Sequence, residues 1–367
     1  MAYGTVNADV IGTSVAGSNL GAGNASAMKN RIINGAMVID QRNAGASVTI
    51  TNTGAVTYTL DRFAAYGSVA SKFSVQQNAG SVTPPVGFTN YLGTTSLSAY
   101  SISASDAFVI LQYIEGYNVA DLGWGTANAK TVTLSFQVYS SLTGTFGGAV
   151  RNSADDRSYP FSYSIPVANT WTTVSVTIAG DTTGTWLKTN GIGMAVIFSL
   201  GTGSNQSGTA GSWQSGIYAS ATGATSVVGT SGATFYITGV QLEVGSSATG
   251  FEYRQYGQEL ALCSRYFQSS FPAGTAVGTV GINSAVDIYS PVSGSGVWFA
   301  TIFLPVRFRA LPTITAYDNV GTAGTVYKGA SGQTASYSYG MSQIIIGSTS
   351  GSTANELYFS WKAEAEL

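Results

Sequence analysis

The chain has no histidine, one cysteine and very little charge. Its 15 Lys and Arg and 17 Asp and Glu make up 9% of 367 residues, whereas an ordinary soluble domain has about 25%. Without histidine, the chain cannot build a Ser-His-Asp or Cys-His catalytic site or a zinc site with histidine ligands. The single Cys263 has no partner for an internal disulfide, which argues against a disulfide-stapled secreted domain.

Other absences narrow the class of protein further. A net charge of −2 provides no basic field for nucleic acid or anionic lipid. The longest apolar run, residues 192–198, is far shorter than the ~20 residues that span a bilayer. The first residues lack the basic and apolar regions of a secretory signal. We therefore expect a protein made in a cytoplasm that binds no nucleic acid and does not insert into a membrane.

The chain does contain a normal share of apolar residues, 44%, arranged largely with a period of two. Apolar residues alternate with Ser, Thr and Gln in residues 130–140 and 171–179, and shorter runs occur at 47–51, 108–114 and 192–200. This period indicates half-buried antiparallel strands with one apolar and one polar face. The Gly, Asn, Ser and Thr turns between them indicate an all-β sandwich or barrel.

Two features interrupt the alternation. The apolar phase changes at Thr238-Gly239, which predicts a β-bulge. Apolar residues recur at helical spacing from Tyr256 to Phe267, which predicts a short helix at the start of this stretch. Cys263 lies on its apolar face and is expected to pack as a small hydrophobe rather than to react.

Two regions are open to two interpretations each. Residues 1–29 are small, polar and glycine-rich, so they form either a flexible tail or an arm that orders only against a partner. Residues 201–232 are equally low in complexity, and they form either a plain Gly/Ser loop or an aromatic-bearing loop at a ligand surface. Beyond the helix, alternating runs at 298–305, 343–347 and 356–367 predict a second β region.

Sugar binding needs flat aromatic faces and uncharged hydrogen-bonding groups, and the chain has 21 Tyr and 6 Trp. Trp124 and Trp213 lie between glycines in loops, where exposed rings are expected. Each ring has a second interpretation, either in the core or in a subunit interface. Trp171, Trp298 and Trp361 are expected in the core, and Trp186 is ambiguous. The candidate ligand-binding residues are Trp124, Trp213, Tyr218, Tyr337 and Tyr339.

Catalysis has weaker support in the sequence. A glycosidase needs two carboxylates held ~5 to 9.5 Å apart, and few acidic residues are available. Asp155 and Asp156, flanked by Arg151 and Arg157, form a surface turn, a weakly supported metal site or a catalytic pair. No GxxxxGK[ST] phosphate loop is present, and no cofactor is expected. The other acidic candidates in this region are Asp106, Glu115, Asp121 and Asp181.

Three stretches, NRIINGAMVIDQRNAGASVT (30–49), GVQLEVGSSATGFEYRQYGQELALCSRYF (239–267) and FSWKAEAEL (359–367), resemble bacteriophage tail-fibre and receptor-binding proteins. Residues 114–144 and 171–186 resemble that family's jelly-roll module, which is similar to carbohydrate-binding modules of the family 4/9 type, and 303–315 resemble its terminal β domain. Unlike many fibres, this chain has no long shaft, heptad or collagen-like repeat.

The resemblance implies a jelly-roll β-sandwich followed by a smaller C-terminal β domain with a short helical connector. It also implies a homotrimer in the virion that contacts host surface polysaccharide and is held by other tail or baseplate proteins through its N-terminus. The divisions are an attachment arm at 1–29, the sandwich at 30–255, the connector at 256–263 and the C-terminal domain at 264–367.

The leading hypothesis is a non-enzymatic tail-fibre protein that adsorbs the particle to host glycan, with copies acting together through avidity. Two alternatives stay open. One is a purely structural neck, baseplate or head protein without glycan binding, and the other is a capsule depolymerase.

Overall fold

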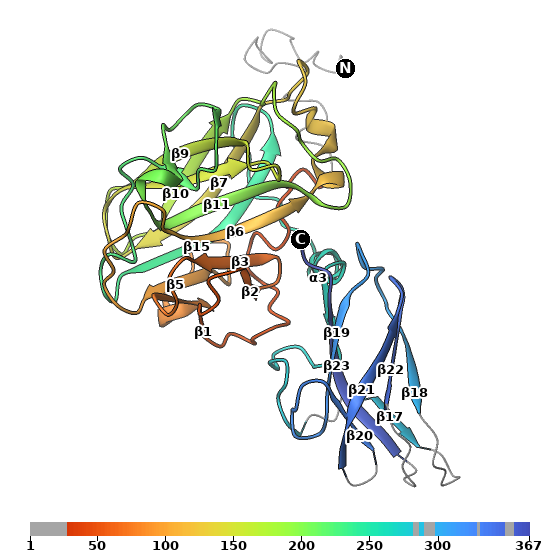
Figure 1. The fold of residues 1–367 in the computed structure, drawn as a ribbon. Helices are drawn as coiled ribbons and strands as arrows, with labels where there is room; N and C mark the ends of the chain where they lie inside the picture. The colour runs from red at the N-terminus through yellow and green to blue at the C-terminus, as the bar shows by residue number, and fades with distance from the viewer. Residues whose placement is uncertain (1–27, 282–285, 290–297, 329–330, 349–355) are drawn as a thin grey trace, which may run out of the picture.

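A computed structural model describes residues 28–281, 286–289, 298–328, 331–348 and 356–367. Within them the chain forms two β domains that meet at one short helix (Figure 1). The prediction of an all-β jelly-roll sandwich followed by a smaller β domain is confirmed. No helix among the described residues has the length and apolar character needed to cross a membrane.

The sandwich consists of two antiparallel sheets. Sheet A has six strands and sheet B has seven. In spatial order, sheet A comprises β1 (Val48–Thr49), β4 (Phe73–Gln77), β5 (Leu92–Ser96), β15 (Thr234–Val244), β7 (Val132–Ser140) and β10 (Thr172–Ile178). Sheet B comprises β13 (Gln214–Ser215), β9 (Arg157–Ile165), β8 (Gly144–Arg151), β11 (Ile192–Thr202), β6 (Ala107–Glu115), β3 (Phe63–Gly67) and β2 (Thr57–Leu60).

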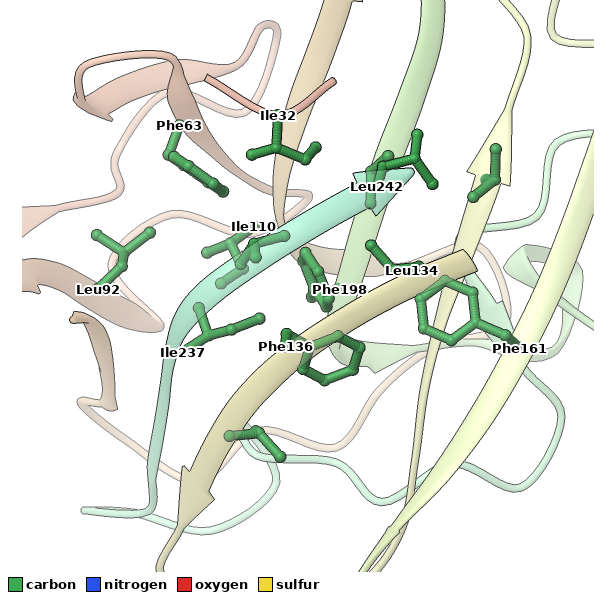
Figure 2. Packing of buried hydrophobic residues seen from close by; sticks show 14 of the residues in the cluster. Ile32, Phe63, Leu92, Ile110, Leu134, Phe136, Phe161, Phe198, Ile237 and Leu242 are labelled. Carbon is green, nitrogen blue, oxygen red and sulfur yellow. The ribbon is translucent and has the colours of Figure 1, made fainter. Parts of the chain in front are cut away.

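The alternating phase of the sequence decides which side chains lie between the sheets. In β7 the apolar phase from Val132 to Val138 is buried in the same core as the facing residues of sheet B. Figure 2 shows this core, where Leu134 and Phe136 of one sheet pack near Phe198 and Phe161 of the other. The intervening residues of β7 and β10 consequently point away from the core.

The predicted bulge is present in β15. The pairing of β15 with β7 shifts between Thr238 and Gln241, and Gly239 has a φ of 61°, a left-handed value that glycine adopts without strain. The shift keeps Phe235 and Ile237, and then Val240 and Leu242, in the core. The phase change in the sequence is thus absorbed by one irregular step.

Residues 201–232 are more ordered than a plain loop. They contain η4 (Ser204–Gln206), β12 (Ser207–Gly208), β13 and β14 (Ser220–Ala221), and β12 pairs with β14 in parallel. Three other single-turn helices occur in the sandwich, η1 (Ala79–Ser81), η2 (Gly116–Asn118) and η3 (Ala120–Leu122).

The predicted connector is helix α3 (Tyr256–Ser264), and Cys263 is buried on it as expected. The C-terminal sheet runs in the order β16 (Phe267–Ser269), β23 (Glu356–Glu364), β20 (Thr325–Lys328), β21 (Ser331–Tyr339), β22 (Gln343–Ser348) and β18 (Phe299–Phe303). Two further strands, β17 (Val286–Tyr289) and β19 (Thr313–Tyr317), also pair with β23.

The C-terminus of the chain lies where the two domains meet (Figure 1). Buried charges near it join the two domains. The carboxylate of Glu366 pairs with Arg42 at 2.6 Å and also with Arg62, both from the sandwich. Glu115 of β6 accepts bonds of 2.9 and 2.7 Å from the guanidinium of Arg265 and one of 2.7 Å from the hydroxyl of Tyr266. We refer to these contacts as the domain junction.

Candidate functional site

The predicted tryptophan site is a packed cluster rather than an exposed platform. Trp124 is only 3% exposed and belongs to the sandwich core, so the expectation of an exposed Trp124 is wrong. Its ring packs edge-on against Trp186 at 4.7 Å and against Trp213 at 5.2 Å. The flanking glycines of Trp124 therefore shape a tight turn that buries the ring instead of presenting it.

Trp213 has a structural role in the same cluster. Its ring is half-buried and lies 5.2 Å from Tyr159, and its indole N–H donates to the Ala179 carbonyl at 2.7 Å. The side chain thereby fastens residues 201–232 to the end of the sandwich. Tyr218 of the same loop is half-buried, and its ring covers Gly208 and Gly216.

Tyr337 and Tyr339 are two residues apart on β21, so their side chains share one face of the strand, but their exposure differs. Tyr337 packs against the core of the C-terminal domain, and its hydroxyl accepts a bond of 3.1 Å from the Ala316 amide. Tyr339 is 50% exposed at the end of β21. Of the five predicted residues, Tyr339 alone presents a largely exposed ring.

The candidate metal and catalytic acids are held by other protein groups. Asp155 pairs with Arg151 at 2.9 Å, and Asp156 accepts a bond of 2.6 Å from the Asn152 amide. No group of three or more His, Cys, Asp or Glu side chains suited to a metal ion occurs in the described part of the chain. Asp155 and Asp156 lie in a turn between β8 and β9, where Arg151 and Asn152 hold their side chains.

Asp181 is held in a buried ion pair. It is buried and forms a two-bond ion pair with Arg157, at 2.7 and 2.8 Å. Although burial raises the pKa of Asp181, the hydrogen bonds from Arg157 and Thr183 outweigh it and lower that pKa. The remaining acids are also engaged: Glu115 at the domain junction, Asp106 with Ser68 and Tyr100, and Asp121 with Arg31.

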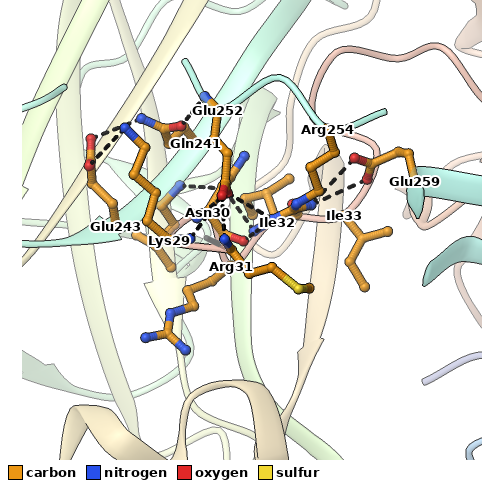
Figure 3. Close-up of polar contacts among 12 residues, drawn as sticks. Lys29, Asn30, Arg31, Ile32, Ile33, Gln241, Glu243, Glu252, Arg254 and Glu259 are labelled. Atoms are coloured by element: carbon orange, nitrogen blue, oxygen red, sulfur yellow. Dashed lines mark hydrogen bonds and ion pairs between the residues drawn. The ribbon is translucent and has the colours of Figure 1, made fainter. Parts of the chain in front are cut away.

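The segment at the start of the described chain is held by a network that we call the clasp (Figure 3). Glu252 accepts hydrogen bonds from the amides of Met28, Lys29 and Asn30. Arg254 donates to the carbonyls of Asn30 and Ile32 and pairs with Glu252 at 3.3 Å. The ion pair between Glu252 and Arg254 is largely shielded from solvent, with side-chain exposures of 14% and 4%.

The clasp continues on both sides of Arg254. Glu259 of α3 accepts from the Asn34 amide, and Glu243 lies 3.8 Å from the ammonium of Lys29. Glu243 therefore pairs with Lys29, not with Arg254. The stretches that resemble phage proteins meet in these contacts, because 30–49 and 239–267 form the clasp while 359–367 reaches the domain junction.

A different surface combines exposed hydroxyls with aromatic rings. On β10, Thr173, Ser175 and Thr177 are exposed, and the first two pair in register with Gln137 and Ser135 of β7. The Thr173 hydroxyl donates to the Gln137 side-chain oxygen at 3.1 Å. These five residues form the hydroxyl strip on the outer face of sheet A.

An aromatic cluster closes one end of the strip. Tyr139 follows Gln137 in the same phase of β7, and its ring is stacked on Tyr236 at 5.3 Å. Trp171 lies 5.5 Å from both Tyr139 and Tyr91, and its indole N–H donates to the Thr83 carbonyl at 2.9 Å. The half-buried rings of Tyr139 and Trp171 are thus held in place by their neighbours.

A second cluster lies across the bulge of β15. A Cβ at Gly239 would come within 2.6 Å of the Phe88 ring, so the ring lies directly on this glycine. Phe88 contacts Phe251 at 5.1 Å and Tyr253 at 5.5 Å. Tyr253 is 60% exposed, and its hydroxyl donates to the Gly87 carbonyl at 2.7 Å.

The residues named for the strip and the two clusters include no Asp, Glu, Lys or Arg. Hydroxyl and amide groups can exchange hydrogen bonds with a ligand's hydroxyls, and aromatic rings can pack against its C–H faces. The sequence did not indicate any of these residues as binding residues, and the prediction of Trp171 in the core is wrong, because its half-buried ring packs against Tyr91 and Tyr139 in a cluster separate from the core between the sheets. The sequence does contain a pattern that could have indicated this surface. In 130–140 and 171–179 the polar positions are Ser, Thr and Gln, and Tyr139 and Trp171 lie at the ends of these runs.

No family model and no curated protein matches the chain. Among solved structures, it is similar to the enzymatically active domain of tailspike protein 4 of bacteriophage CBA120, with 13% identity, a TM-score of 0.29, and 59% of this chain and 22% of that chain covered. It is also similar to a family 4 carbohydrate-binding module (CBM4), with 15% identity, a TM-score of 0.28, and 58% and 98% of the two chains covered.

A third similar structure is the family 11 carbohydrate-binding module from Clostridium thermocellum in complex with a mixed-linked tetrasaccharide. It has 10% identity and a TM-score of 0.27, with 55% of this chain and 96% of that chain covered. At these identities and TM-scores, none of the three assigns a ligand or an activity to this chain.

Proposed function

We propose that the protein is a non-enzymatic adhesin that binds uncharged surface glycan through the outer face of sheet A. The observation that supports this most directly is the hydroxyl strip, bordered by the ring pair Tyr139–Trp171. Such a surface offers many weak hydrogen bonds and ring contacts, and several copies acting together would raise the effective affinity.

We further propose that the protein is part of a phage tail fibre in the virion, attached through residues 1–29 and assembled as a homotrimer. The resemblance of 30–49, 239–267 and 359–367 to tail-fibre proteins supports this role. The clasp supports it as well, because it fixes the point at which the preceding 27 residues join the sandwich. Residues 1–27 themselves lie outside the described residues.

The proposal contains no catalytic step, because the acidic residues considered as catalysts are engaged in ion pairs or local hydrogen bonds. A depolymerase would release new reducing ends or acetyl groups from host polysaccharide. We expect none when the purified protein is incubated with a polysaccharide that it binds.

Glycan binding is tested with the full chain on an array of bacterial surface polysaccharides. Ser175→Arg places a long charged side chain in the middle of the strip, and we expect at least a tenfold loss of binding. Ser164→Arg is the matched control, because Ser164 is an exposed strand serine on sheet B. Equal binding by both variants and the unaltered protein would overturn the proposed site.

The virion role needs a separate test. Labelled particles treated with an antibody against residues 264–367 should adsorb poorly to host cells. Undiminished adsorption would favour a purely structural role in the particle.

A further inference from the structure

A groove of about 550 Å³ opens where the two domains meet. One wall comes from the edge strand β2 of sheet B, which includes Tyr58. The other comes from the C-terminal domain and includes Leu311, Thr313 and Lys362. Its volume lies within the range of small-molecule sites, ~300–1,000 Å³. Because it lies beside sheet B, it is separate from the outer face of sheet A.

The walls of the groove are fixed before any ligand arrives. The guanidinium of Arg42 lies 4.0 Å from the ring centre of Phe267 and 5.3 Å from that of Tyr58. Its terminal nitrogens bond Glu364 at 3.2 Å and Glu366 at 2.6 Å. The Tyr58 hydroxyl donates to the Leu367 carbonyl at 2.8 Å. A preformed site binds with less loss of entropy than one that must be ordered by its ligand.

The cationic side chains in the groove already have partners within the protein. Both terminal nitrogens of Arg42 are held by glutamates, and Arg309 donates to the carbonyls of Asn190, Ala365 and Glu366. The Lys362 ammonium bonds Glu364 at 2.9 Å. A neutral ligand can bind without breaking any of these bonds.

The lining of the groove offers both polar and apolar groups. Leu311 is 61% exposed, and Tyr58, which also lines the groove, is half-buried. Lys362 and Glu364 remain 25% and 29% exposed, and an ammonium group has donors beyond the one used by Glu364. A ligand with one C–H face and several hydroxyls satisfies both kinds of surface.

We propose that this groove is a second saccharide site, which takes a short uncharged oligosaccharide between Tyr58 and Leu311. The class of ligand rests on the proposed function, but the location does not, since the groove shares no residue with the hydroxyl strip. Two sites on one chain would let a single polysaccharide be held at two points, which raises its apparent affinity.

The test is titration calorimetry of the full chain with neutral trisaccharides, including maltotriose, cellotriose and trisaccharide fragments of any polysaccharide bound on the array. We expect two sites per chain for a trisaccharide that binds. Leu311→Arg should remove one of them, and Ser175→Arg should remove the other. Leu97→Arg, a change at a 44% exposed leucine outside the groove lining, should leave both.

The outcomes separate the two proposals. A single site that is lost in Ser175→Arg and kept in Leu311→Arg overturns the groove and leaves the proposed function intact. A single site lost only in Leu311→Arg supports the groove and overturns the assignment to sheet A. No binding by any of these trisaccharides overturns the groove as a saccharide site.

Discussion

The clasp and the outer face of sheet A use opposite chemistry. The clasp gathers Lys29, Glu243, Glu252, Arg254 and Glu259 into buried or nearly buried ion pairs. The outer face of sheet A has exposed hydroxyls and rings and none of these charges. In a chain with 9% charged residues, many of the charges therefore hold segments together rather than meet solvent.

This difference explains why low charge is compatible with a well-defined architecture. Buried ion pairs contribute little net stability, but losing one partner is costly because the other charge remains buried. Any conformation in which residues 28–34 or the C-terminal tail move away from their ion-pair partners is therefore higher in free energy. The uncharged face has no such constraint, so its residues can change with the ligand at little cost to folding.

The largest expected effect comes from breaking the clasp. Arg254→Ala removes the guanidinium, 4% exposed, that joins two carbonyls to Glu252 and Glu259. We expect a loss of ~3–5 kcal/mol in the free energy of unfolding, measured with urea. The control Lys188→Ala, at an exposed lysine, should change it by less than ~0.5 kcal/mol. If both variants lost a similar amount of unfolding free energy, the clasp would not be more important for stability than an exposed lysine.

The next effect depends on pH and involves Asp61, a buried residue next to Arg62 that accepts hydrogen bonds from the backbone and side-chain amides of Gln41. Burial raises the pKa of Asp61 to about 6 from its ordinary 3.8, despite the opposing effects of Arg42 and Gln41. The folded state therefore binds a proton more readily than the unfolded state, and this site gains stability as the pH falls from 7 to 4. The shift of roughly two units corresponds to about 3 kcal/mol.

Comparison with Asp61→Asn isolates this contribution, because the variant cannot ionise at that position. The stability of the unaltered protein relative to the variant should rise as the pH is lowered through 6. A relative loss over the same interval, measured by urea unfolding at several pH values, would contradict the direction.

A smaller loss of stability is expected when one charge of the domain junction is removed while the size of the side chain is kept. Glu366→Gln keeps the side-chain volume but takes the negative charge from Arg42 and Arg62. We expect a loss of about 2 kcal/mol, together with faster proteolysis in 255–266. Unchanged proteolysis would show that other contacts hold the two domains together.

The smallest effect on stability is expected on the outer face of sheet A. Ser175→Arg changes an exposed side chain and should alter the free energy of unfolding by less than ~0.5 kcal/mol, although it should abolish most glycan binding. A large loss of stability would mean that this face is packed against another part of the protein.

The sequence allowed the fold to be predicted further than the site. Alternation in 130–140 and 171–179, the phase change at Thr238-Gly239 and the helix at 256–263 all depend on local patterns that burial imposes. The exposure of Trp124 could not be read locally, because Trp186 and Trp213, distant in sequence, cover its ring. The clasp could not be predicted either, because it depends on residue 30 lying beside residue 242, which no local pattern indicates.

The most direct test of the account follows the indole N–H resonances of the six tryptophans by NMR while a bound polysaccharide fragment is added. Trp171 borders the hydroxyl strip, whereas Trp124 and Trp361 are buried in the two cores. The account predicts that the Trp171 resonance shifts and saturates with binding while those of Trp124 and Trp361 stay in place. Saturating binding with an unchanged Trp171 resonance would contradict it.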